Sequence, residues 1–156
     1  MRYYTLLAVL FSAVLFIGGC KKKDDPSRKE LIARTWKLTA QTSDPSLPLG
    51  GSQLTDVYSQ LRTCFKDNTY IFESSGSYRS EEGASKCNDS DPVIVESGTW
   101  TLSSDEKTLS VTTANGNSRT EYTIVSISSS EMKATYIFNL QGSTLNYKQS
   151  VTFTAQ

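Results

Sequence analysis

The chain contains no histidine, and this absence limits the chemistry that it can perform. Histidine is the commonest general base and proton shuttle in enzymes and the commonest metal ligand in proteins. The sequence also lacks a G-x-S-x-G nucleophile elbow, a glycine-rich phosphate loop and a Walker motif. We therefore expect a protein that is not an enzyme, with no catalytic residue, no metal site and no cofactor.

The chain also has no excess of charge of either sign. Its 16 basic residues are balanced by 16 acidic residues, and after residue 28 the lysines and arginines are spread along the sequence. Proteins that bind nucleic acid need a basic patch to neutralise phosphates, and no such patch is visible here. We therefore expect no nucleic-acid partner.

The one long apolar segment lies at the N-terminus and is organised like a secretion signal. Arg2 precedes an apolar stretch over residues 6–17, which is too short to span a bilayer stably. Ile17-Gly18-Gly19-Cys20 follows and resembles the lipobox of bacterial lipoproteins, in which the cysteine is lipidated and the leader is cut before it. The resemblance implies a signal peptide over residues 1–19 and a membrane anchor at Cys20. An ordinary cleaved signal with an incidental cysteine is the alternative.

A charged segment over residues 20–30 follows as a tether to a domain over residues 31–156. Lys21-Lys22-Lys23-Asp24-Asp25 is similar to the lysine-then-acid signal that sends lipoproteins of some Gram-negative bacteria to the cell surface. The alternative interpretation is a solvated spacer, since blocks of charge are usually hydrated. We expect an exported protein that is lipid-anchored to the outer membrane, facing either the periplasm or the cell surface.

Cysteine is scarce, and only Cys64 and Cys87 remain after Cys20. An exported protein meets an oxidising compartment, where paired cysteines form disulfides. We therefore expect a Cys64–Cys87 disulfide. A redox-active thiol pair is the alternative, although the C-x-x-C spacing typical of such pairs is missing.

The domain has the composition and patterning of a β protein. Tyrosine, phenylalanine, serine and threonine are abundant. Trp36, Leu38 and Ala40 alternate with polar residues, which predicts a first strand over residues 34–42. A Pro/Gly loop over residues 44–51 follows. Ser52 is then placed to cap a short helix over residues 52–61, with apolar residues on one face.

From residue 62 onward, strands recur with turn signals between them. Asn115-Gly116 is the strongest hairpin signal, and a change of face near Ile124-Val125 indicates a bulge. We expect an all-β fold: an antiparallel meander barrel of eight or nine strands with one short helix after the first strand, because closure removes the sheet edges. A two-sheet sandwich is the alternative. The later strands are expected near residues 69–73, 77–80, 93–102, 109–111, 119–127, 132–140 and 145–153.

Four segments in this order resemble the bacterial lipocalin-like lipoproteins: Trp36-Lys37-Leu38, the run from Cys64 to Phe72, the run from Glu82 to Cys87, and Gly98-Thr99-Trp100-Thr101-Leu102. The resemblance spans about residues 31–154. It implies a lipocalin-like calyx, with an N-terminal Trp plugging one end and an interior able to take a small apolar molecule. One departure is Arg34, which stands where the lipocalin fingerprint has glycine.

Alternation in the strands places a set of side chains inside the barrel, and these are the candidates for ligand binding. Barrels of eight strands are either filled by side chains or hold one small ligand, and the sequence leaves both open. We expect a monomeric, lipid-anchored protein that binds a small apolar ligand. The alternative is a protein-interaction or inhibitor module with a solid barrel, whose loops over residues 43–51 and 83–92 contact a protein partner. The ligand-binding candidates are Trp36, Tyr70, Phe72, Tyr78, Trp100, Tyr122, Tyr136, Phe138, Tyr147 and Gln149, and Leu102 and Phe153 are also expected to point inward.

Overall fold

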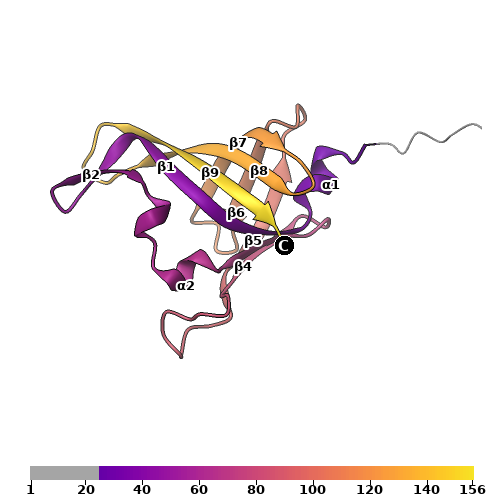
Figure 1. Cartoon of the computed structure of the whole chain (residues 1–156). Helices are drawn as coiled ribbons and strands as arrows, with labels where there is room; N and C mark the ends of the chain where they lie inside the picture. The colour runs from indigo at the N-terminus through magenta and orange to yellow at the C-terminus, as the bar shows by residue number, and fades with distance from the viewer. Residues whose placement is uncertain (1–24) are drawn as a thin grey trace, which may run out of the picture.

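Antiparallel strands make up most of the protein in a computed structural model that describes residues 25–156 (Figure 1). The predicted lipobox, Cys20 and most of the charged motif lie outside the described residues. None of the described helices is both long and apolar enough to be a candidate for crossing a membrane. The elements are α1 (Arg28–Ile32), β1 (Thr35–Leu49), β2 (Ser52–Asp56), a 3-10 turn (Tyr58–Gln60), α2 (Thr63–Lys66), β3 (Thr69–Phe72), β4 (Ser77–Glu81), β5 (Ile94–Leu102), β6 (Thr108–Thr113), β7 (Arg119–Ile127), β8 (Glu131–Asn139) and β9 (Asn146–Ala155).

The strands close into a barrel of eight with one additional strand. From β3 to β9 each strand pairs with the next along the chain, and β1 pairs with both β3 and β9 to close the ring. The additional strand, β2, pairs only with β1. The predicted meander barrel is confirmed, as are the β6–β7 hairpin at Asn115-Gly116 and the bulge between Ile124 and Ser126.

The predicted helix over residues 52–61 is wrong in its first half. Gly50 and Gly51 adopt positive φ angles of 56° and 82°, which glycine tolerates without steric cost. This turn lets residues 52–54 pair with residues 47–49, so the segment becomes β2 and β1 runs beyond its predicted end. We call this projecting β1–β2 hairpin the arm. The short helix after the first strands lies at Thr63–Lys66 instead.

One end of the barrel is closed by α1 and by the residues that follow it. Ser27 begins α1 with a capping box, in which its Oγ accepts from the Glu30 N–H at 3.3 Å and its N–H donates to Glu30 Oε2 at 2.7 Å. Ile32 and Trp36 are completely buried, and the Trp36 indole Nε1–H donates to the Ile32 carbonyl at 2.9 Å. Helix α1 therefore begins inside the segment predicted as a tether, and Trp36 lies at this closed end, as the resemblance implies.

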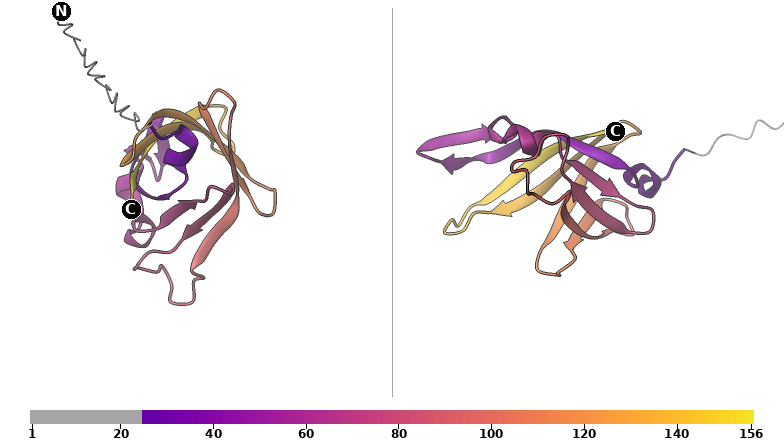
Figure 2. Two further views of the ribbon diagram at one scale, coloured as in Figure 1. Left: turned by 90° about the vertical axis from the view of Figure 1, so that its right-hand side faces the viewer. Right: turned by 90° about the horizontal axis from the view of Figure 1, so that it is seen from below.

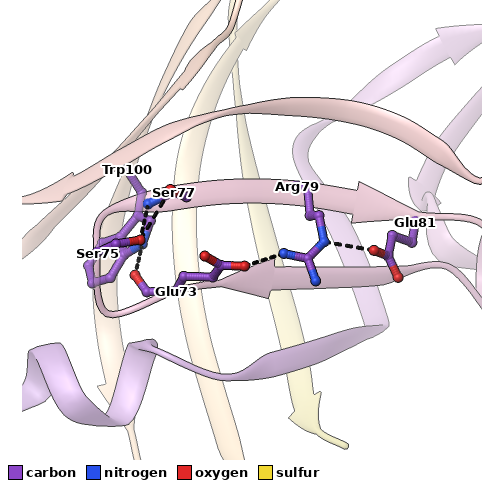
Figure 3. A network of polar contacts seen from close by, with 6 residues as sticks. All are labelled: Glu73, Ser75, Ser77, Arg79, Glu81 and Trp100. Atoms are coloured by element: carbon purple, nitrogen blue, oxygen red, sulfur yellow. Dashed lines mark hydrogen bonds and ion pairs between the residues drawn. The ribbon is translucent and has the colours of Figure 1, made fainter.

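The β3–β4 hairpin turn lies at the closed end and is held by polar contacts (Figure 3). The Trp100 indole N–H donates to the Glu73 carbonyl at 2.8 Å, which ties β5 to this turn. Arg79 lies between two carboxylates on the hairpin, pairing with Glu81 at 2.7 Å and also with Glu73. The bond between Trp100 and Glu73 holds the indole ring at the closed end of the barrel.

The opposite end of the barrel, which we call the mouth, carries the longer connections. The arm, α2, the β4–β5 loop and the β6–β7 and β8–β9 turns gather there (Figure 1). The left view in Figure 2 looks onto the α1 end, and the right view shows the arm projecting at the far end. The α1 end of the barrel is closed to an entering molecule by α1 and Trp36, whereas the mouth is open.

Candidate functional site

The part of the barrel between the closed end and the mouth has almost no free volume inside. Its core joins residues from every strand of the ring, and aromatic rings contact one another there: Phe72 lies 5.2 Å from Tyr78 and 5.9 Å from Trp100 between centroids. The remaining internal cavity is about 20 Å³, which leaves room for about one water molecule and none for a ligand. The interior below the mouth is therefore filled by side chains. This cavity is lined by Tyr70, Phe72, Tyr78, Leu109, Val111, Tyr122, Met132 and Phe153.

The predicted inward residues take three different positions. One set is buried, a second set is half-buried, and Phe138 is 40% exposed. Phe138 differs because β7 and β8 pair only as far as Thr123 and Thr135, so the following residues of β8 lie beside an opening between the strands. The buried set is Trp36, Phe72, Tyr78, Trp100, Tyr147, Gln149 and Phe153, and the half-buried set is Tyr70, Leu102, Tyr122 and Tyr136.

An open cleft of about 720 Å³ lies in the mouth, and we call it the mouth cleft. Tyr70 lines both this cleft and the small internal cavity, so its ring forms part of the cleft floor. The walls carry apolar side chains from four different elements, and a single charged residue, Glu96, is among them. The full lining is Leu38, Gln41, Leu61, Phe65, Asn68, Tyr70, Ser80, Val95, Glu96, Ser97, Thr113, Ala114 and Asn115.

A second, apolar hollow of about 280 Å³ lies between the arm and the β8–β9 hairpin, and we call it the arm groove. Leu61 lines both the arm groove and the mouth cleft, so the two hollows share a wall. One elongated molecule could therefore contact both. The arm groove is lined by Leu47, Pro48, Leu49, Leu54, Val57, Gln60, Leu61, Phe138 and Leu140.

The inward face of the barrel becomes polar toward the mouth. On β5, Glu96 shares its face with Trp100, because alternate residues of a strand point to the same side. The Tyr78 hydroxyl donates to Glu96 Oε2 at 3.2 Å. Burial raises the pKa of Tyr70, Tyr78 and Tyr122, and the nearby Glu96 carboxylate raises each further. These phenols are therefore neutral at physiological pH.

Beside this cluster, Gln149 is held in a chain of hydrogen bonds. Its Nε2 donates to Ser43 Oγ at 2.7 Å, and its Oε1 accepts from Gln41 Nε2 at 3.1 Å. Gln41 Nε2 also donates to the Tyr136 hydroxyl at 3.1 Å. Gln149 is only 1% exposed, so its amide joins β9 to β1 and is not open to the cleft.

The predicted Cys64–Cys87 disulfide is present, with a Cα–Cα distance of 5.2 Å. It joins α2 to the β4–β5 loop at the mouth. Next to it, the Arg62 guanidinium donates to the Cys87 carbonyl at 3.3 Å. The disulfide thereby fixes the segment that carries Phe65, one wall of the mouth cleft.

Sequence reasoning missed Glu96 and Gln41 as site residues. Glu96 could have been found from its spacing, because residues 96, 98 and 100 fall on one face of a strand that buries Trp100. Gln41 is harder to predict, since a bulge between Leu38 and Ala40 shifts the register of β1 just before it. The bulge returns Gln41 to the inward face.

Comparison with protein families agrees with this architecture. A family model described as a lipocalin-like domain matches residues 32–134. Two solved structures of bovine odorant binding protein are similar, one in complex with a selenium-containing odorant at 12% identity and one with undecanal at 14%. Each alignment covers 87% of this chain and 77% of the bovine chain, with a TM-score of 0.44. No curated protein is similar enough in sequence to match. Since the family model covers more than half of the chain, the protein belongs to the lipocalin-like domain family.

Proposed function

We propose that the protein is a lipid-anchored binding protein of the cell envelope that takes a small, largely apolar ligand in the mouth cleft. The observation that carries this proposal is the cleft itself, about 720 Å³ in volume and open at the end opposite α1. Small-molecule sites are concave, mostly apolar, and contain a few polar groups that orient the ligand. The mouth cleft fits this description in volume, and its lining combines apolar side chains with several polar groups that can orient a ligand.

The solid lower barrel limits how deep the ligand enters. Only about 20 Å³ is free below Tyr70, so a ligand rests on the ring of that residue and extends toward Leu61 and the arm groove. Each CH₂ group that it buries there contributes about 0.8 kcal/mol. Ligands long enough to reach the arm groove are therefore expected to bind more tightly than shorter ones of the same chemistry.

The anchor at Cys20 is the second part of the proposal and rests on the lipobox resemblance. Substitution Cys20→Ala should release the protein from the membrane fraction, and protease treatment of intact cells tests whether the domain faces outward. Replacement of Lys21-Lys22-Lys23-Asp24-Asp25 by alanines should protect the domain if this motif directs surface display. An unchanged membrane association of Cys20→Ala would contradict the anchor.

Ligand binding is tested by isothermal titration of the mature chain, residues 20–156 with Cys20→Ser, against 1-octanol. We expect saturable binding that Leu61→Gln weakens by about tenfold, since losing the burial of one leucine costs about 1.5 kcal/mol. Val125→Gln is the matched control, because Val125 is 61% exposed on β7 and lines none of the hollows described above. If neither octanol nor octylamine, an amine of the same chain length, binds to the parent protein, the proposal is contradicted and a protein-interaction module is favoured.

A further inference from the structure

Glu96 is a carboxylate without a cationic partner in the mouth cleft. Among residues 25–156, it is the only charged residue that lines the cleft. The four ion pairs in the described part of the chain use Glu73, Glu81, Glu121 and Glu131, and none uses Glu96. Its negative charge is therefore left without a neutralising side chain at the place where a ligand would lie.

The surroundings of Glu96 donate few hydrogen bonds to its carboxylate. It is half-buried and faces inward, and it accepts one hydrogen bond, from the Tyr78 hydroxyl at 3.2 Å. An ionised carboxylate has about four acceptor positions, so most of the positions on Glu96 remain open to a donor from outside the protein. A protonated amine adds Coulomb attraction to this carboxylate and has three N–H donors, whereas a neutral hydroxyl has one donor and no charge.

The aromatic rings near Glu96 favour the same kind of ligand. Tyr70 lines the cleft floor, and the face of such a ring attracts cations at distances of up to about 6 Å. The ring of Phe65, on a wall of the cleft, already has the Arg62 guanidinium 5.9 Å from its centroid. The tyrosines are neutral, since burial raises the pKa of Tyr70 and Tyr78, so they add no negative or positive charge of their own. The Glu96 carboxylate repels anionic ligands in the cleft.

The rest of the cleft requires that the ligand also has an apolar part. Leu61 and Val95 line its walls, and the arm groove continues from Leu61 with a lining of leucine, proline, valine and phenylalanine. Building on the proposed binding function, we propose that the mouth cleft selects a protonated organic amine with an apolar chain or ring, its ammonium group at Glu96 and its apolar part against Leu61.

Three ligands of one chain length separate this proposal from the proposed function. The mature chain is titrated with octylamine, 1-octanol and sodium octanoate at pH 7, where the amine is protonated. We expect octylamine to bind about tenfold more tightly than octanol, and octanoate to bind most weakly. If octanol binds as tightly as octylamine, amine selection is refuted and the binding function stands. If none of the three binds, both proposals fail.

Variants then assign the preference to the carboxylate. Glu96→Gln should bring the affinity for octylamine down to that for octanol without changing octanol binding. Glu121→Gln, which removes an exposed carboxylate of an ion pair outside the cleft, should keep the tenfold preference. Tyr78→Phe leaves the carboxylate in place and should also keep it. Retention of the preference for octylamine in Glu96→Gln, or its loss in Tyr78→Phe, would overturn the assignment to Glu96. If Glu96→Gln does not fold, the three-ligand series on the parent protein still decides whether the cleft selects amines.

Discussion

Gly98 occupies a position on β5 where a side chain has no room. It lies opposite Tyr78 on β4 and Thr113 on β6. A Cβ atom built on it would lie 2.0 Å from the carbonyl oxygen and 2.9 Å from the carbonyl carbon of Thr112. Both are backbone atoms, so Gly98→Ala can be accommodated only if β5 and β6 move apart.

The loss of stability caused by this movement depends on the packing of Trp100, which β5 carries. Two residues further on, Trp100 is 3% exposed and its indole N–H bonds to the Glu73 carbonyl, so a shift of β5 disturbs packing at the barrel bottom. Overpacking of a core costs about 1 to 3 kcal/mol, and contact with rigid backbone places Gly98→Ala near the upper value. With an m-value of about 2 kcal/mol/M, the urea midpoint should fall by roughly 1 to 1.5 M.

Urea unfolding followed by tryptophan fluorescence measures this effect, because both tryptophans are buried in the folded barrel. Thr99→Val is the matched control. Thr99 is the next residue on the same strand, its side chain is exposed, and the substitution keeps a β-branched residue, so we expect a change within about 0.5 kcal/mol. Equal midpoints for the two variants would refute the argument that close approach of β5 and β6 requires glycine.

Two further predictions concern the disulfide and alkaline pH. Reducing Cys64–Cys87 should lower the free energy of unfolding by about 3.4 kcal/mol, because the bond closes a loop with a sequence separation of 23. Unchanged urea midpoints with and without reductant would contradict this. Raising the pH above about 10 should destabilise the fold, because the pKa values of Tyr70, Tyr78 and Tyr122 are raised in the barrel and only the unfolded chain releases these protons at its ordinary pKa. Each tyrosine contributes a slope of up to about 1.4 kcal/mol per pH unit, so midpoints that stay constant from pH 8 to 11 would contradict the burial of the phenols.

The strands were predictable because the barrel buries one face of each. The segment over residues 119–127, predicted as a strand with a bulge near Ile124-Val125, is β7 with the same bounds, and the hairpin signal Asn115-Gly116 lies at the observed turn. The error over residues 52–61 has a physical cause. The apolar spacing there fits a helix, but the turn at Gly50-Gly51 supplies β1 as a pairing partner, and strand pairing outweighs the local pattern.

The candidate site was predictable only in part. Tyr70 and Tyr78 were expected to point inward from alternation, whereas the filled interior could not be predicted, because free volume depends on how side chains from distant strands interlock. The capping box of Ser27 and Glu30 was present in the sequence but lay inside a charged run that favoured a tether. The charged composition of this run therefore led to the prediction of a tether where the structure has the start of α1.

The position of α1 decides which way the protein would face on a membrane. The chain enters the barrel through α1 at the closed end, and the mouth cleft opens at the other end (Figure 1). A lipid on Cys20, as we propose, would attach the protein on the side of the closed end, so the mouth would point away from the bilayer. Molecules dissolved in the surrounding water would then meet the opening directly, whereas a lipid from the supporting bilayer would first have to leave it.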